Sequence, residues 1–194
     1  MTNEHHCTFC NESKMNVGEK TEYGSIIIYK IGNNHNGWFA TLSPRTGGNP
    51  EKNFTVQLMT LSHLTHFSEI FKNKELAKNY GIALAKIYNA VTEIIKEDPF
   101  FELDAKTREK GIALAVYGKC TTWEKKKEHL HFKVFQFQDS LGQPFTVDSS
   151  FGRKKVFVDP VSQEKFIKMT PVIKKPIREK RLQYLSKRLI ELLN

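Results

Sequence analysis

The sequence has few cysteines and no long apolar run. Three cysteines among 194 residues are an odd number and give no disulfide framework. No apolar run approaches the roughly 20 residues that a membrane-spanning helix needs. The polar N-terminus, Met1 to Cys10, does not have the pattern of a secretory signal. There is also no internal repeat and no low-complexity linker. We therefore expect a cytoplasmic protein with no membrane partner.

The net charge of +9 is concentrated near the C-terminus. From Ser150 to Asn194 the chain has twelve Lys or Arg and four Asp or Glu, so nearly all of the excess lies in the last quarter. Such a segment attracts a polyanion, either nucleic acid or a nucleotide phosphate. The alternative is the solvated face of a helix. Charge alone leaves both interpretations open.

Hydrophobic periodicity predicts an α+β fold. Runs rich in β-branched or alternating apolar residues predict strands at 25–31, 38–42, 54–59, 111–117 and 129–137. An apolar stripe predicts a long helix over 74–96, and a second amphipathic helix is expected over 177–193. Hairpin-length connections favour antiparallel strands. We expect an antiparallel sheet with one long helix packed on it, plus a C-terminal strand and helix extension.

The segment from His129 to Phe135 carries the strongest chemical signal. Side chains alternate along a strand, so His129, His131 and Lys133 are expected to share one face. Three such groups side by side are unfavourable unless an anion or a metal offsets their charge. A neutral imidazole is a good nucleophile towards a phosphoryl centre, and neighbouring donors stabilise the charge on its oxygens. The alternative is an exposed His-x-His without function.

Cys7 and Cys10 form a Cys-x-x-Cys pair at a polar chain end, where metal binding is a better interpretation than redox chemistry. With His63 and His129 they supply two thiolates and two imidazoles, a common tetrahedral zinc set. Bound zinc would fasten the N-terminus to the sheet. The alternative is a pair of free cysteines, and the rival ligands are His5, His6 and His66.

Two further groups are candidates for substrate binding. Lys127, with its neighbours Lys125 and Lys126, either helps to collect a phosphate or lies in a solvated loop. Aromatic faces stack well on nucleobases, although aromatic residues also belong in cores. The candidates for such stacking are Trp38, Phe39 and Trp123.

These residues resemble the histidine-triad superfamily of nucleotide hydrolases and transferases. The family motif is His-φ-His-φ-His-φ-φ, with φ apolar, and the chain has His129-Leu-His131-Phe-Lys133-Val-Phe135, which differs only at the third histidine. The resemblance covers about residues 7 to 137. Its upstream parts are the zinc pair Cys7-Thr-Phe-Cys10, the pocket strand Phe39-Ala-Thr-Leu-Ser-Pro44, and the strand and loop histidine at 54–63.

The resemblance implies that His131 is the nucleophile that becomes nucleotidylated. His129 would be a zinc ligand or orient that nucleophile, and His63, Cys7 and Cys10 would complete a structural Zn²⁺ site. Lys133 takes the place of the third histidine, which is glutamine in the galactose-1-phosphate uridylyltransferase branch. Lysine keeps the donor capacity of that position but not the geometry of an imidazole.

The resemblance also implies that Phe39 and Thr41 line the nucleotide pocket. Two departures stand out: Ala40-Thr41-Leu42 lacks the acidic residue that usually holds the ribose, and Lys125 to Glu128 replaces a Gly-Gln-Ser-like phosphate donor. The family architecture implies a homodimer. We expect a histidine-triad domain with its N-terminal zinc-binding segment at 1–140 and a basic extension packed on the same domain at 141–194.

The expected function is hydrolysis of a nucleotide phosphoanhydride, or transfer of a nucleoside monophosphate, on a nucleotide or dinucleotide substrate. Two alternatives remain open. One is a catalytically inactive protein of the same fold that binds nucleotide or RNA through its basic C-terminal segment. The other is a purely structural zinc protein.

Overall fold

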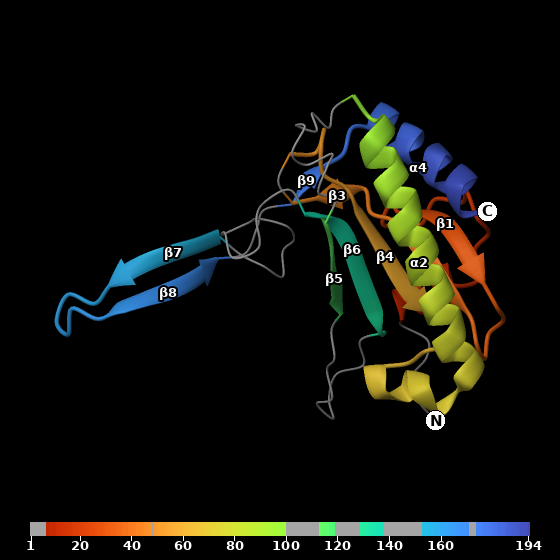
Figure 1. Cartoon of the computed structure of the whole chain (residues 1–194), viewed down its shortest axis with the longest axis horizontal. Helices are drawn as coiled ribbons and strands as arrows, with labels where there is room; N and C mark the ends of the chain where they lie inside the picture. The colour runs from red at the N-terminus through yellow and green to blue at the C-terminus, as the bar shows by residue number, and fades with distance from the viewer. Residues whose placement is uncertain (1–6, 48, 100–112, 119–128, 138–152, 171–173) are drawn as a thin grey trace.

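The fold is α+β, as predicted, with an antiparallel sheet that carries its two longest helices on one face (Figure 1). The computed structural model describes residues 7–47, 49–99, 113–118, 129–137, 153–170 and 174–194. The main sheet has five strands in the order β1-β2-β4-β6-β5, and all of its neighbouring pairs are antiparallel. These strands are β1 (Ile26–Ile31), β2 (Trp38–Leu42), β4 (Thr55–Thr60), β5 (Ala113–Gly118) and β6 (His131–Phe137).

The five strands match the predicted ranges closely, with one correction that matters for the site. β6 begins at His131, so His129 precedes the strand instead of lying in it. The ladder between β4 and β6 ends at the pair Met59 and His131. Just before it, the backbone N–H of Leu130 donates to the carbonyl of Leu64, outside the sheet, at 2.6 Å.

The long helix α2 (Lys74–Glu97) packs on one face of this sheet, where the main core lies. Asn73 caps its start, because its side-chain oxygen accepts hydrogen bonds from the N–H groups of Glu75 and Leu76 at 3.1 Å each. Trp38 is fully buried and donates its indole N–H to the carbonyl of Leu76 at 2.9 Å. The predicted apolar stripe faces the core through Leu76, Ala83, Ile87, Ala90, Val91, Ile94 and Ile95.

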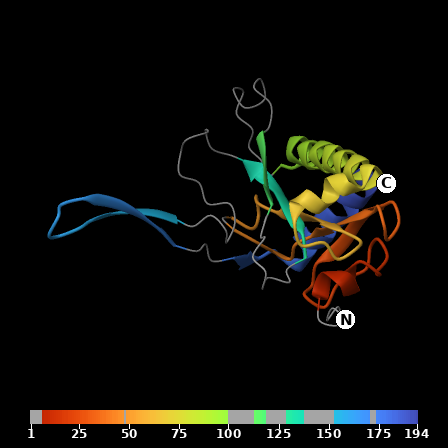
Figure 2. The same ribbon diagram turned by 90° about the horizontal axis from the view of Figure 1, so that it is seen from below.

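The N-terminal segment covers the opposite face of the sheet. Figure 2 shows α1 (Thr8–Glu12) on the far side of the sheet from α2. A smaller cluster of buried residues lies beneath this segment and consists of Ile27, Phe39, Met59 and Leu61, packed against Phe9, Met15 and Val17. Lys30 on β1 holds the segment down, because its ammonium donates to the carbonyls of Ser13 at 2.8 Å and Met15 at 3.0 Å.

The last helix, α4 (Glu179–Leu193), confirms the amphipathic helix predicted near the C-terminus. It lies beside α2 and buries Leu182, Leu185, Leu189 and Leu193 in the main core. Just before it, β9 (Lys175–Pro176) pairs with β3 (Arg45–Thr46), a short strand that was not among the predicted strands. The predicted domain boundary at residues 140 and 141 lies outside the described residues and stays a prediction.

A 3-10 helix and two strands complete the described chain. A 3-10 helix, η2 (Phe67–Lys72), leads from the loop after β4 into α2. The strands β7 (Arg153–Val158) and β8 (Lys165–Thr170) form a separate antiparallel hairpin that extends away from the rest of the molecule in Figures 1 and 2. Among the described helices, none has the length and hydropathy needed to cross a membrane.

Candidate metal centre and adjoining histidine

The four predicted metal ligands come together in space. The sulfurs of Cys7 and Cys10 and one ring nitrogen each of His63 and His129 all lie within 4.8 Å of one another. The Cys10 sulfur is 3.2 Å from Nδ1 of His63, and Nδ1 of His129 is 3.5 Å from the Cys7 sulfur and 3.6 Å from the Cys10 sulfur. Zinc bonds of about 2.0–2.3 Å place sulfur and nitrogen ligands roughly 3.5 Å apart around a tetrahedron. The cluster therefore has the size of a metal site.

Three separate segments position these side chains. Cys7 caps the N-terminus of α1, and its carbonyl accepts a hydrogen bond from the N–H of Cys10 at 3.1 Å. Residues three apart on a helical turn lie on the same side, so the Cys-x-x-Cys spacing presents both sulfurs together. His63 follows β4 and His129 precedes β6, which are neighbouring strands, so the sheet brings both rings to one end.

The surroundings of His129 suit a neutral ligand. Its side chain is 3 % exposed, and Nε2 lies 2.8 Å from the carbonyl oxygen of Thr60 and 3.1 Å from the Thr60 hydroxyl. A carbonyl only accepts, so Nε2–H donates to it and Nδ1 offers its lone pair towards the sulfurs. Burial lowers the pKa of His129 to about 4; the bond to Thr60 opposes this shift, while the charges of His63 and His131 add to it.

His131 is half-buried at the first position of β6, and its Nδ1 lies 3.0 Å from the backbone carbonyl of His129. Nδ1–H donates to that carbonyl, so the lone pair of the neutral ring is on Nε2. The Phe9 ring packs against both imidazoles, with centroids 5.8 Å from that of His129 and 5.6 Å from that of His131. The metal cluster and His131 therefore adjoin each other.

Lys133 shares the strand face of His131, because the two are separated by one residue in β6. It is 7 % exposed and lies opposite Gln57 on β4 and Tyr117 on β5. The predicted row of three side chains on one strand face is corrected accordingly. His131 and Lys133 form the row, whereas His129 precedes the strand and directs its ring into the cysteine cluster.

The residues predicted to bind substrate are either buried or outside the described part of the chain. Phe39 and Thr41 are both 0 % exposed. Phe39 packs beneath the N-terminal segment, and Thr41 lies opposite Gln57 in the sheet register. Neither side chain reaches the molecular surface, where a substrate would bind. Lys127 and Trp123 fall outside the described residues.

Of the rival metal ligands, His66 lies at the start of η2 and is not part of the four-residue cluster. Its Nδ1 accepts a hydrogen bond from the N–H of Ser68 at 3.1 Å, and its own N–H donates to Glu69 at 2.9 Å, which forms the N-terminal cap of η2. His5 and His6 lie outside the described residues. Sequence reasoning missed Thr60 and Phe9, whose contacts with the histidines depend on chain segments that are distant in sequence.

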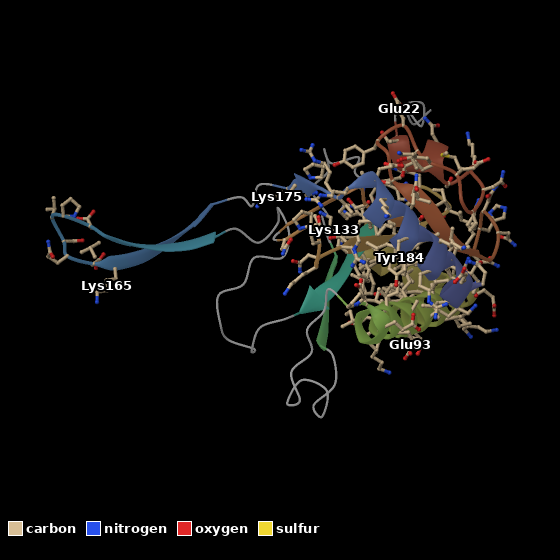
Figure 3. The ribbon with its side chains drawn as sticks, turned by 90° about the horizontal axis from the view of Figure 1, so that it is seen from above. Glu22, Glu93, Lys133, Lys165, Lys175 and Tyr184 are labelled. Carbon is tan, nitrogen blue, oxygen red and sulfur yellow. The ribbon has the colours of Figure 1, made fainter. Side chains whose placement is uncertain are left out.

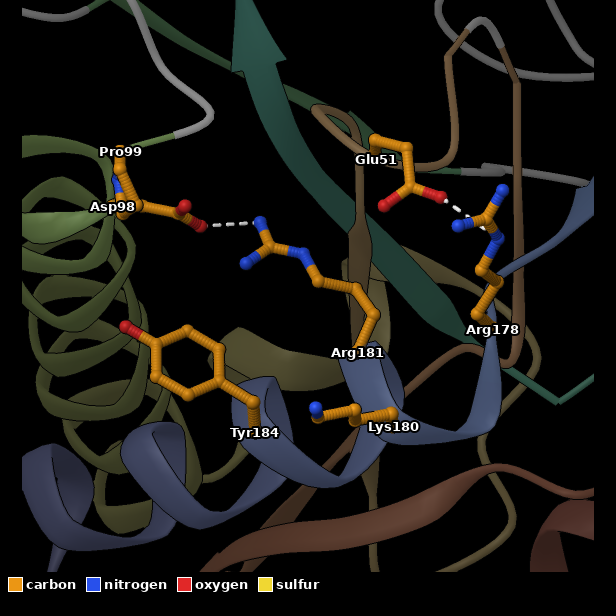
Figure 4. A pocket seen from close by; sticks show the side chains of 7 residues that line it. All are labelled: Glu51, Asp98, Pro99, Arg178, Lys180, Arg181 and Tyr184. Atoms are coloured by element: carbon orange, nitrogen blue, oxygen red, sulfur yellow. Dashed lines mark ion pairs between the residues drawn. The ribbon is translucent and has the colours of Figure 1, made fainter.

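A second feature, a cavity of about 470 Å³, lies between the end of α2 and the start of α4 (Figure 4). A buried ion pair between Asp98 and Arg181 and a more exposed pair between Arg178 and Glu51, at 3.1 Å, join its walls. Its remaining lining residues are Pro99, Lys180 and Tyr184. None of the predicted site residues lines this cavity.

Comparisons of the chain with models of protein families, with curated proteins and with solved structures found no match.

Proposed function

We propose that the chain is a zinc-containing enzyme of the histidine-triad kind that forms a covalent nucleotidyl-histidine at His131. Its substrate would be a nucleotide or dinucleotide with a phosphoanhydride bond, and water or a second acceptor would resolve the intermediate. The observation that carries the proposal is the bond from His131 Nδ1–H to the carbonyl of His129, beside the four-ligand cluster.

The donor set favours zinc in a structural role. Two cysteines and two histidines form a closed tetrahedral set that leaves no position for substrate, whereas catalytic zinc sites keep one position open. Bound there, zinc would hold α1 against the ends of β4 and β6. The backbone of His129 would be fixed at the same time, since His129 is one of the ligands.

The chemistry then belongs to His131. Nε2 attacks the α-phosphorus, a nitrogen–phosphorus bond forms, and the bond to the leaving phosphate oxygen breaks. The ring becomes cationic while Nδ1–H stays bonded to the His129 carbonyl, which stabilises the positive charge. Lys133 on the same strand face supplies positive charge to the non-bridging oxygens. Attack by water or another acceptor on phosphorus returns His131 to its neutral form.

The test uses the zinc-loaded full chain and a fluorescent dinucleoside polyphosphate. His131→Ala is expected to lower turnover by at least about a thousandfold, because the nucleophile is lost. The protein should also form an acid-labile nucleotidyl adduct that the variant lacks. His35→Ala is the matched control, since His35 is exposed in the turn between β1 and β2.

Equal turnover in His131→Ala and the unaltered chain would contradict the proposal. Nucleotide binding without turnover by the unaltered chain would also contradict it and would favour the inactive binding protein. The resemblance further leads us to propose a homodimer, which sedimentation of the same sample measures.

A further inference from the structure

The hairpin of β7 and β8 is a part of the chain that the proposed chemistry does not use. The two strands pair only with each other among the described strands, over six residue pairs from Arg153 with Thr170 to Val158 with Lys165. Figure 3 shows Lys165 on this arm, far from Lys133 in the body of the molecule. An isolated two-stranded ribbon is only marginally stable in water, so a partner that packs against this arm would stabilise it.

The charge of the arm favours an anionic partner. Between residues 153 and 170 the sequence has five Lys or Arg and two Asp or Glu. Lys155 lies directly opposite Lys168 in the strand register. Arg153 comes two residues before Lys155 in β7. Like charges directly opposite each other are unfavourable unless an anion lies against them.

The tip of the arm exposes an apolar side chain. Asp159 closes the turn: its N–H donates to the carbonyl of Glu164 at 2.9 Å, and its carboxylate accepts from the N–H groups of Val161 and Ser162 at 2.8 Å each. Val161 is 91 % exposed at this tip. The arm therefore combines a basic stem with an exposed aliphatic tip.

We propose that the β7–β8 arm binds duplex DNA, with its basic stem along the phosphates and Val161 against base edges in a groove. A two-stranded ribbon fits the major groove of B-form DNA, and apolar side chains contact the thymine methyl group there. The deep, narrow major groove of A-form RNA does not admit such an element. A second copy of this chain docked arm to arm is a poorer partner, because each arm has five Lys or Arg and only two Asp or Glu. The inference does not depend on the nucleotidyl-transfer proposal.

The experiment measures anisotropy of labelled duplex DNA, with the same strand alone and an RNA duplex of equal length, against the zinc-loaded full chain at several salt concentrations. Lys155→Glu with Lys168→Glu is expected to weaken duplex binding by at least about tenfold. It should also lower the slope of log K against log salt by about 2, since each lost phosphate contact removes about 0.9. Val161→Ser is expected to weaken binding several-fold without changing that slope, because the valine contacts bases.

The matched control is Lys74→Glu with Lys78→Glu, which changes the net charge equally at exposed positions of α2. The control variant should bind duplex DNA with an affinity within about threefold of that of the unaltered chain, because only the net charge has changed. The proposal is overturned if the arm variant and this control lose equal affinity. It is also overturned if the single strand or the RNA duplex binds as tightly as duplex DNA, or if Val161→Ser dissociates a dimer and leaves DNA binding intact. Circular dichroism and metal content verify that each variant is folded.

Discussion

The ring of His131 donates a hydrogen bond from Nδ1 to the backbone carbonyl of His129, 3.0 Å away. The ring of His129 belongs to the cluster formed with Cys7, Cys10 and His63. One residue therefore takes part in the candidate metal site through its side chain and holds the proposed nucleophile through its backbone. A substitution in the cluster should therefore change the position of His131 even though His131 itself is unaltered.

Removal of a metal ligand tests this coupling. His63→Ala is expected to reduce the metal content and to lower turnover by about 10- to 100-fold, the usual effect of disturbing groups that orient a site. His63 follows β4, and its ring centroid lies 5.1 Å from that of His129, so the loss would act through His129. His35→Ala, an exposed histidine in a turn, should change neither property. Loss of metal with unchanged turnover would show that the carbonyl of His129 needs no metal to stay in place.

Lys30 is expected to support metal binding from a distance. Its ammonium donates to the carbonyls of Ser13 and Met15, which follow α1. Lys30→Met keeps most of the aliphatic stem and removes both bonds, so the segment that carries the cysteines should become looser. We expect zinc affinity to fall by about tenfold, from the cost of about 1–3 kcal/mol for unpaired polar groups. Competition with a chromogenic chelator measures it.

Lys20→Met is the control for Lys30→Met. Lys20 pairs with Glu179 at 3.2 Å, and both side chains are more than half exposed. Exposed ion pairs contribute little to stability. Equal zinc affinity in the two variants would contradict a specific role for Lys30.

The pH dependence of stability should report on Glu69, which accepts hydrogen bonds from the N–H groups of Thr65 and His66 at 3.0 and 2.9 Å. Burial alone raises the pKa of Glu69, but these bonds outweigh it and hold the pKa below its usual range. The unfolded chain thus binds a proton more readily than the folded one. The stabilisation is complete above the unfolded pKa of about 4.3 and is lost as pH falls through the folded pKa.

Glu69→Gln should therefore be less stable than the unaltered chain near neutral pH, and the difference should shrink in acid. Urea unfolding from about pH 6 to about pH 3 measures it, across the range where glutamate titrates. Glu93→Gln removes a partly exposed carboxylate that pairs with exposed Lys96 on α2 and should show a smaller difference. A constant difference for Glu69→Gln at all pH values would contradict this account.

The elements with clear periodicity were predictable from the sequence. β2 matches its predicted range residue for residue, and α2 extends only one residue beyond its predicted end. Such elements are readable because burial of one face imposes a period of 2 or 3.6 on the apolar residues. α1 was not predicted, since a helix of five residues is too short to show a period.

The residues of the site could be predicted, but the hydrogen bonds that hold them in place could not. Residue types and spacing allowed the ligand set but left rival histidines open, and the structure brings Cys7, Cys10, His63 and His129 together. The start of β6 was placed two residues early because the apolar alternation continues through Leu130, which instead bonds to Leu64 outside the ladder. The contact between His129 and the Thr60 carbonyl joins residues 69 positions apart. No local pattern encodes such a backbone acceptor.

We expect a neutral hydrogen-bond donor at position 133 to preserve more of the turnover than an apolar side chain does. Its position is nearly buried on the strand face of His131, so a group there lies close to any phosphate at His131. Lys133→Gln keeps a donor and is expected to retain part of the turnover. Lys133→Met removes the donor and should lower kcat by about 10²–10³, as loss of a charge-stabilising donor does. Equal kcat values for the two variants would contradict a donor role.

The ion pair between Asp98 and Arg181 should be the most sensitive polar contact between α2 and α4. Asp98 directly follows α2, Arg181 lies in the first turn of α4, and their side chains are 0 % and 7 % exposed (Figure 4). Removal of one partner from a buried pair leaves an uncompensated charge. Arg181→Met is therefore expected to cost about 3–5 kcal/mol in the free energy of unfolding.

The double variant Asp98→Leu with Arg181→Met separates this cause from lost packing. It removes both charges, so it should be more stable than Arg181→Met alone, because buried pairs replaced by apolar residues often cost little. Arg188→Met breaks a more exposed pair with Glu97 on the same two helices and should destabilise the chain far less. If the double variant were as unstable as the single one in urea unfolding, packing of the Arg181 stem and not its charge would hold α4 against α2.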